Sequence, residues 1–296
     1  MAQFDAPTRT LISHAQISRG HGRIIYWIVL GFFLVVFTLI FIFPLYWMAT
    51  GGLKSAQEVI QSPPTWFPHV LKWSNYADAW RHLKLARLLL NTTIYAGGAL
   101  VFQLVFDVAA AYALSKLRPV FGNIVLFLML ATLMIPATVL ALPTFLTVFN
   151  LPLLHINLTN SPWAIWLPSV ANGFNIFLLK RFFDSIPDEL LQAAAIDGSG
   201  PIRTLWSIIL PMSRPIIGVV SIFSITAVWK DFLWPLLVEP SPDTKTVNVG
   251  IYAFSTGLGQ NVVIAAAVIA AIPTVIFFLI FQKNIMSGLT VGGLRG

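Results

Sequence analysis

The sequence predicts an all-α fold, a polytopic membrane bundle of six transmembrane helices. Three observations lead to this fold class. Hydrophobic residues make up 57% of the chain and charged residues only 10%, whereas soluble domains have about 25% charged residues. The charges are also clustered, because no Asp, Glu, Lys or Arg occurs at 24–53, 119–179 or 246–282. Segments of this kind need lipid or protein around them.

Each expected helix is an apolar stretch of about 20 residues, the length that crosses a bilayer. The first stretch is too long for a secretion signal and no small-residue cleavage pattern follows it, so we expect it to remain as a membrane anchor. Turn-forming residues between Pro143 and Pro162 separate the third stretch from the fourth. The six expected spans are residues 24–48, 88–115, 121–142, 162–179, 215–238 and 262–281.

The distribution of lysine and arginine predicts the orientation, because short cytoplasmic loops contain an excess of both. With the N-terminus inside, most of the 18 lysine and arginine residues fall on the cytoplasmic side. Both termini are then cytoplasmic. The expected parts are a cytoplasmic N-terminal tail (1–23), a first transmembrane helix with an outer loop (24–87), a five-helix core (88–281) with one long cytoplasmic loop (184–214), and a cytoplasmic C-terminal tail (282–296).

The composition also argues against several kinds of site. The chain has no cysteine, which excludes disulfides, thiolate catalysis and cysteine metal sites. Its five histidines show no metal-ligand spacing. Cytoplasmic basic residues and anionic lipid headgroups account for the net charge of +7, so no nucleic-acid partner is needed. We therefore expect no metal, no cofactor and no catalytic residue.

The most informative segment is a polar island between two expected spans, IPDELLQAAAIDGSGPIRTLWSIILP at residues 186–211. Ser185 and Asp188 have the spacing of a capping box, and Gly198 can adopt the positive φ that ends a helix. A second helix is expected from Pro201 to Pro211. One face of the first helix is expected to be small and flat enough for close packing against a partner, with Leu190, Ala193, Ala194 and Asp197.

This island resembles the EAA loop of the membrane subunits of ABC importers. The family pattern is Glu-Ala-Ala, three residues, Gly, nine residues, Ile, one residue, Leu-Pro. The family's glutamate is Gln192 here, and Glu189, one turn earlier, could take its place. An ordinary amphipathic cytoplasmic hairpin is the alternative interpretation. The resemblance implies that the residues coupling the chain to an ATPase are Glu189, Gln192, Ala193, Ala194, Asp197, Gly198, Ile208, Leu210 and Pro211.

Other segments are similar to the carbohydrate (maltose-type) class of these permeases, and together they extend over most of the chain. They are residues 90–92 (LNT), 109–114 (AAAYAL), 177–187 and 229–237 (WKDFLWPLL). The class usually has asparagine where Lys230 stands. The C-terminal residues resemble the tail that reaches between paired ATPase subunits, which implies ATPase contacts at Gly288, Thr290, Gly292, Gly293 and Arg295.

The resemblance implies a type I importer core in a bacterial plasma membrane. It further implies a second related permease subunit, two ATP-binding cassette ATPase subunits and an extracytoplasmic sugar-binding protein, with lipid around the spans. The chain itself lacks a phosphate-binding loop, because the glycine-rich segment 198–204 has no lysine at the required position. ATP hydrolysis is therefore expected on a separate subunit, and the chain is expected to be a non-catalytic transport subunit.

Polar side chains inside apolar spans are costly and suggest function. Two interpretations stay open for them. They line a translocation path for hydroxyl-rich solutes, or they bond between helices and to a second membrane subunit. Asp107, a carboxylate within the second expected span, is open to the same two interpretations. The candidates for the path are Asn91, Asn172, Asn175, Trp229, Lys230 and Asp231.

Two alternative functions remain at this point. One is a secondary transporter that uses an ion gradient, although the chain shows no convincing internal repeat. The other is an importer of a non-sugar solute such as a glycerol phosphate or a polyol. A membrane enzyme would need a cluster of His, Asp or Glu within the spans, and none is apparent in the sequence.

Overall fold

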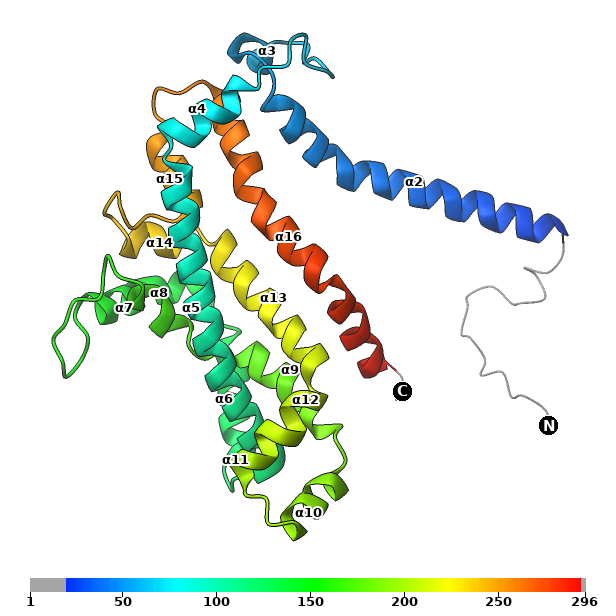
Figure 1. Ribbon diagram of the computed structural model, residues 1–296, viewed down its shortest axis with the longest axis vertical. Helices are drawn as coiled ribbons and strands as arrows, with labels where there is room; N and C mark the ends of the chain where they lie inside the picture. The colour runs from blue at the N-terminus through cyan, green and yellow to red at the C-terminus, as the bar shows by residue number, and fades with distance from the viewer. Residues whose placement is uncertain (1–19, 294–296) are drawn as a thin grey trace.

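The computed structural model describes residues 20–293. All regular structure in these residues is helical, which confirms the all-α class. The molecule is elongated, as Figure 1 shows. The short helices α3 (Ala56–Ile60) and α4 (Ser74–His82) lie at one end, and α10 (Asp188–Ile196) and α11 (Pro201–Thr204) lie at the other.

Three helices are long and apolar enough to cross a membrane alone. They are α2 (Gly20–Gly51), α16 (Gln260–Gly293) and α5 (Leu85–Tyr112), which continues into the π-helical turn η1 (Ala113–Leu117). Two further spans result if each of two bent helix pairs is counted as one. The membrane bundle is thus confirmed, whereas the expected number of six spans is not.

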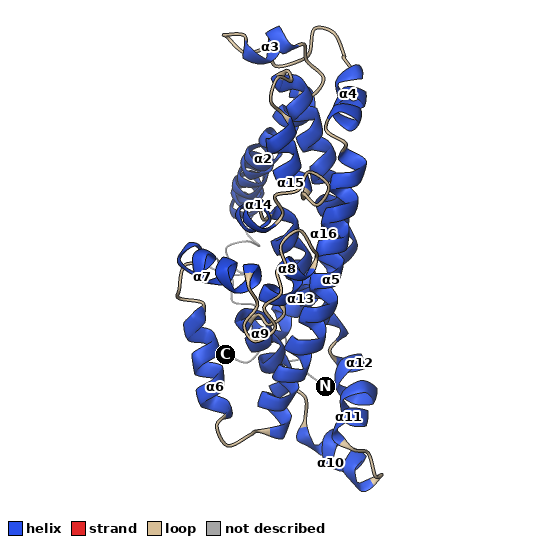
Figure 2. Cartoon of the chain, turned by 90° about the vertical axis from the view of Figure 1, so that its left-hand side faces the viewer, coloured by secondary structure: helices blue, strands red, loops and turns tan. Residues whose placement is uncertain are grey.

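The expected third span, 121–142, is two helices and not one. Helix α6 (Gly122–Thr132) and helix α7 (Ala137–Phe149) meet at 104°, and Figure 2 shows their different directions. Pro136 occupies the N-cap of α7 with φ −57° and ψ 131°. Proline has no amide hydrogen and disfavours a helical conformation in the residue before it. The break therefore follows from one residue inside an otherwise apolar stretch.

The expected fourth span, 162–179, is also interrupted. It contains α8 (Trp163–Ser169) and the first part of α9 (Gly173–Asp184), with three non-helical residues between them. Asn172 caps α9, because its Oδ1 accepts two backbone N–H groups of the first turn, at 3.0 and 3.1 Å. The backbone N–H of Asn172 in turn donates to Asp107 Oδ1 at 2.9 Å. Asp107 therefore fixes the start of α9 from the neighbouring helix α5.

The expected fifth span, 215–238, breaks near its C-terminal end. Helix α13 (Arg214–Lys230) stops at Asp231, and α14 (Leu233–Val238) follows in a new direction. The Asp231 Oδ1 accepts the backbone N–H of Trp234 at 3.4 Å. Phe232 is the N-cap of α14 and makes no side-chain cap bond, so Asp231, the residue before it, bonds the first turn of α14 instead.

The core lies where α5 and α13 pack along each other, with α9 and α16 on either side. Polar groups within it bond between helices. Asn175 Nδ2 lies 3.3 Å from Ser224 Oγ and 3.5 Å from Gln103 Oε1, and all three side chains are buried. Burial of amides and hydroxyls in a bundle requires such partners. These contacts support the interpretation of several polar residues as interhelical bonds.

Helix α2 lies apart from this core. Figure 1 shows it running away from the bundle, and it contacts α16 only near its C-terminal end. None of the most hydrophobic stretch of α2 is buried by the rest of the chain. An apolar helix such as α2, without packing in its own chain, needs lipid or another chain around it.

The short helix α15 (Val247–Phe254), in contrast, packs on α5 and α16 near the end of the bundle that holds α4.

Candidate coupling hairpin and membrane cavity

Residues 186–211 form the helical hairpin that the sequence predicts, and we call it the coupling hairpin. After α10 the chain turns at Gly198, whose φ is +75°. The Ser199 N–H donates to the Ala194 carbonyl at 2.8 Å and closes the end of α10. The second helix runs through α11, the π-helical turn η2 (Leu205–Ile209) and α12 (Leu210–Met212), so the expected helix from Pro201 is present.

The expected capping box at the start of α10 is wrong. Pro187 is the N-cap and makes no side-chain cap bond. The Ser185 hydroxyl donates backward to the Phe182 carbonyl at 2.6 Å. Asp188 does not cap either, because its carboxylate pairs with basic residues that follow α5. Two cations at 2.7 and 2.8 Å compete for that carboxylate more strongly than a backbone amide does.

The coupling hairpin is held at its start by two basic side chains. Lys116 Nζ donates to the Ile186 carbonyl and to Asp188 Oδ1, both at 2.7 Å. Arg118 binds the other carboxylate oxygen at 2.8 Å. The hydrogen bond from Lys116 and the charge of Lys116, followed by those of Arg118, lower the pKa of Asp188 below the ordinary 3.8, although desolvation acts in the opposite direction. Because its pKa is lowered, the ionised Asp188 carboxylate and its ion pairs stabilise the fold above pH about 4. This stabilisation is lost as the pH falls further and the carboxylate is protonated.

Two more contacts fix the same region to the C-terminal end of α5 and to η1. Asp184, just before the hairpin, accepts bonds from Ser115 at 2.7 Å and from Lys180 at 2.8 Å. The Tyr112 hydroxyl donates to the carbonyl of Pro201, the first residue of α11, at 3.1 Å. Both halves of the coupling hairpin are therefore hydrogen-bonded to the C-terminal turns of α5 and to η1.

The coupling hairpin presents apolar side chains to the outside. Among the predicted coupling residues, Ala194 is buried and Ile208 and Leu210 are partly buried. The remaining six are exposed: Glu189, Gln192, Ala193, Asp197, Gly198 and Pro211. Four large apolar residues are also exposed, and we call them the coupling face: Leu190 (41%), Ile196 (87%), Ile202 (75%) and Trp206 (68%). Large exposed apolar side chains that gather on one short segment make it a candidate contact surface.

Sequence reasoning included Leu190 in this surface and missed the other three. The available signal was an isoleucine or tryptophan every few residues within a segment otherwise rich in acids, glycine and alanine. These residues can be assigned to one surface only when the turn at Gly198 is known. The turn determines the relative orientation of the two helices of the coupling hairpin.

Replacing Lys116 by methionine is expected to loosen the coupling hairpin. The charge-assisted bond from Lys116 to the Ile186 carbonyl contributes about 1.5–3 kcal/mol, and 1.4 kcal/mol is a factor of about ten. Amide hydrogen exchange at residues 186–211 of the purified protein should therefore accelerate about tenfold. Arg118→Gln is the matched control, because Arg118 is 68% exposed whereas Lys116 is 2% exposed. Equal acceleration in both variants would contradict the assignment.

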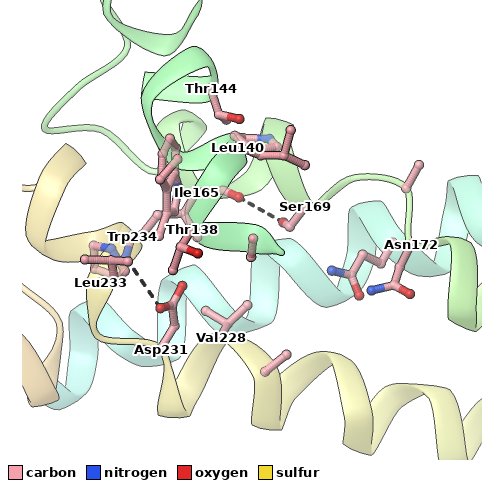
Figure 3. A pocket seen from close by; sticks show the side chains of 17 residues that line it. Thr138, Leu140, Thr144, Ile165, Ser169, Asn172, Val228, Asp231, Leu233 and Trp234 are labelled. Atoms are coloured by element: carbon pink, nitrogen blue, oxygen red, sulfur yellow. Dashed lines mark hydrogen bonds between the residues drawn. The ribbon is translucent and has the colours of Figure 1, made fainter. Parts of the chain in front are cut away.

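A cavity of about 610 Å³ lies among α5, α7, α8, α13 and α14, and we call it the membrane cavity. Figure 3 shows side chains from these separate segments around one space. Its walls are mainly apolar, with Leu140, Ile165, Val228 and Trp234 among them. Its polar groups are Gln103, Thr138, Thr144, Ser169, Asn172 and Asp231. A mainly apolar space with a few convergent polar groups is the usual form of a small-molecule site.

The structure brings only two of the predicted path residues to the membrane cavity, Asn172 and Asp231. Asn175 lies buried beside it and bonds between helices. The Asn91 amide donates to backbone carbonyls of the loop before α15, at 2.8 and 3.0 Å. Trp229 and Lys230 line a different, second cavity of about 340 Å³ between α13, α15 and α16.

The predicted tail residues lie at the end of the chain. Residues 288–293 continue helix α16, so their backbone is helical. Four of the five predicted ATPase contacts fall in this part, and Arg295 lies outside the described residues.

Comparison with known proteins agrees with this architecture. A family model described as "Binding-protein-dependent transport system inner membrane component" matches residues 103–290. The chain is 30% identical over 266 residues to the sn-glycerol-3-phosphate transport system permease protein UgpE of Yersinia pestis bv. Antiqua (strain Antiqua), covering 86% of this chain and 93% of that protein. It is 33% identical over 259 residues to the sulfoquinovosyl glycerol transport system permease protein SmoH of Agrobacterium fabrum, covering 86% and 89%.

The diacetylchitobiose uptake system permease protein NgcG of Streptomyces coelicolor is 28% identical over 266 residues, covering 88% of this chain and 87% of that protein. A solved structure with the same fold is a chain of a bacterial ABC transporter involved in the import of the acidic polysaccharide alginate, with a TM-score of 0.77, 23% identity, and coverage of 93% and 99%. The chain therefore belongs to the family of binding-protein-dependent transport system inner membrane components, the permeases of ABC importers.

Proposed function

We propose that this chain forms half of the translocation path of an ATP-driven, binding-protein-dependent sugar importer. The coupling hairpin is the observation that supports this most strongly. It is bonded to α5 through Lys116, Ser115 and Tyr112, and it exposes the coupling face on its free side. A stiff attachment combined with an apolar contact surface is what force transfer from a separate ATPase requires.

A sugar is the proposed solute. Two of the relatives are named for saccharide-containing solutes, diacetylchitobiose and sulfoquinovosyl glycerol. A third is named for sn-glycerol-3-phosphate, so a glycerol phosphate or polyol is the alternative within the same mechanism. The membrane cavity supports a hydroxyl-rich solute, because its polar side chains offer both donors and acceptors beside the Trp234 ring.

The proposed assembly contains a second related permease subunit, two ATPase subunits and an extracytoplasmic sugar-binding protein. It lies in a bacterial plasma membrane with both termini of this chain in the cytoplasm. Catalysis of ATP hydrolysis belongs to the other subunits. The C-terminal residues 288–295 are proposed to contact the ATPases, and the coupling hairpin is proposed to fit a groove on one of them.

Single-cysteine crosslinking tests the coupling role. The chain has no cysteine of its own, so a new thiol has no background. Ala193 is exposed and Ala194, one position on, is 8% exposed. In cells that hold the whole operon, a short thiol-to-amine crosslinker on Ala193→Cys should capture an ATPase subunit. Ala194→Cys is the matched control, and we expect it to capture little.

Uptake by proteoliposomes then separates the proposed mechanism from a secondary transporter. Vesicles with the ATPase subunits and internal ATP should accumulate the solute held by the binding protein. Vesicles without those subunits should not, whatever proton or sodium gradient is imposed. Failure of Ala193→Cys to capture any ATPase, together with uptake on an ion gradient alone, would overturn the proposed function.

A further inference from the structure

Two adjacent side chains of opposite charge lie at the outer end of α13 and face different cavities. Asp231 lines the membrane cavity, whereas Lys230 lines the second cavity together with Trp229, Asn248 and Thr274. The chain leaves α13 after Lys230, and Asp231 has an extended backbone with φ −66° and ψ 136°, so the two neighbouring side chains leave the chain in different directions. The positive charge of Lys230 is therefore on another wall and does not neutralise the membrane cavity from within.

Asp231 is the single charged residue among those that line the membrane cavity. The other polar groups there are amides and hydroxyls, which are neutral. Among the side chains described at residues 23–282, Asp231 takes part in no ion pair, and its Oδ1 accepts the backbone N–H of Trp234. Figure 3 shows its carboxylate among the labelled lining residues, with Thr138 and Leu233 nearby in the view. An ionised carboxylate only accepts hydrogen bonds.

We infer that Asp231 makes the membrane cavity selective by charge, admitting uncharged or cationic hydroxyl-rich solutes and repelling anionic ones. The inference rests on the proposed function only in taking the membrane cavity as part of the solute's path. A charge acts more strongly beside mainly apolar walls than in bulk water, because the effective dielectric constant there is lower. A cavity lined by one sign of charge raises the local concentration of solutes of the other sign.

The charge of Asp231 ranks the possible solutes by their own net charge. Neutral saccharides and polyols donate hydroxyl hydrogens to the carboxylate, and amino sugars add an attractive positive charge. Sugar phosphates, sulfonates and uronates have a negative charge that the carboxylate repels, and none of the other lining residues supplies a cation to offset it. Uncharged carbohydrate is therefore the substrate class that this cavity favours.

Charged thiol reagents test the inference directly, because the chain has no native cysteine. Thr138→Cys places a thiol in the wall of the membrane cavity. The assembled complex in nanodiscs, without ATP, is treated with a cationic methanethiosulfonate (ethyltrimethylammonium) or an anionic one (ethylsulfonate). Labelling of this chain is followed by intact mass, and each rate is divided by the rate of the same reagent with 2-mercaptoethanol.

The expected normalised rate is at least about tenfold higher for the cationic reagent. Asp231→Asn, which keeps the shape and removes the charge, should bring the two rates within about twofold of each other. Lys230→Gln is the matched control and should leave the ratio unchanged. Ser169→Cys repeats the measurement from another wall, in case Thr138→Cys does not assemble.

Equal rates with Asp231 present, faster labelling by the anionic reagent, or no labelling at either position would overturn the inference. The last result would mean that solutes do not reach the cavity. The measurement uses no ATP and no transport, so it can fail while the crosslink from Ala193→Cys succeeds. Conversely, charge selectivity can be present in a chain that captures no ATPase.

Discussion

Replacing Gly98 by alanine is expected to destabilise the assembled complex and to abolish transport. A Cβ atom at this position of α5 would lie 2.2 Å from the Trp166 ring, with the indole nitrogen at 2.4 Å. The ring cannot move aside easily. Its Nε1–H donates to the Tyr95 carbonyl at 3.1 Å, and it packs against Phe102 and Trp163 with centroids 5.7 and 5.3 Å away.

The substitution therefore pushes α8 away from α5. Overpacking of this kind costs about 1–3 kcal/mol, and α8 contributes Ile165 and Ser169 to the membrane cavity. Both the thermal unfolding temperature of the purified complex and its uptake activity should fall. Gly97→Ala is the matched control on the same helix, because a Cβ there meets nothing within 4 Å and alanine favours a helix. A Gly98→Ala complex as stable as Gly97→Ala would show that the contact between α5 and α8 is dispensable.

Replacing Gly198 by valine is expected to uncouple transport from ATP hydrolysis while insertion into the membrane continues. Gly198 has φ +75°, a conformation that β-branched residues adopt only at considerable cost. A residue held in such a region costs about 1–3 kcal/mol. The cheapest response is a change of the turn between α10 and α11, which moves the coupling face without touching the transmembrane helices.

Gly200→Val is the matched control for this prediction. Gly200 lies two residues on in the same turn with φ −75° and ψ 168°, an extended conformation that valine prefers. A Cβ meets nothing within 4 Å at either glycine, so only the backbone conformation distinguishes them. Uptake per ATP hydrolysed should fall about tenfold or more for Gly198→Val and change little for Gly200→Val. Normal uptake in the Gly198 variant would show that the turn does not determine coupling.

Much of the fold could be predicted from the sequence because hydropathy records lipid contact directly. The apolar stretches of α2, α5 and α16 are long and uninterrupted, so their expected bounds agree within a few residues with the segments Arg23–Gly51, Leu85–Leu117 and Gln260–Gln282. The continuation of α16 to Gly293 is not predicted by hydropathy. The interruptions were missed for the same reason. Window averages treat Pro136 as one residue among twenty, although its missing amide hydrogen ends a helix. Asn172 and Asp231 are predicted as polar residues in spans, but their bonds to the first turns of α9 and α14 depend on helix breaks that the hydropathy pattern does not contain.

The candidate site was predictable in part. The turn at Gly198 and the second helix follow from local chain chemistry, which a sequence records. The bonds from Lys116 and Tyr112 to the coupling hairpin do not, because they join residues about 70 to 90 positions apart. The membrane cavity was missed as a unit for this reason. Gln103, Thr138 and Ser169 are unremarkable in their own segments, and only the packing of α5, α7 and α8 brings them together.

The two π-helical turns have a mechanical consequence. One closes α5 where Lys116 reaches the coupling hairpin, and the other lies within the second helix of that hairpin. A π turn contains one residue more than an α turn, and each residue of an α-helix corresponds to a rotation of about 100° around the axis. If the π turn shifts by one residue along the helix, the helical segment beyond it rotates about the helix axis. The backbone hydrogen bonds break and re-form one at a time during this shift. A rotation at one end of such a helix can thus reach the residues beyond the π turn without the loss of all its backbone bonds at once.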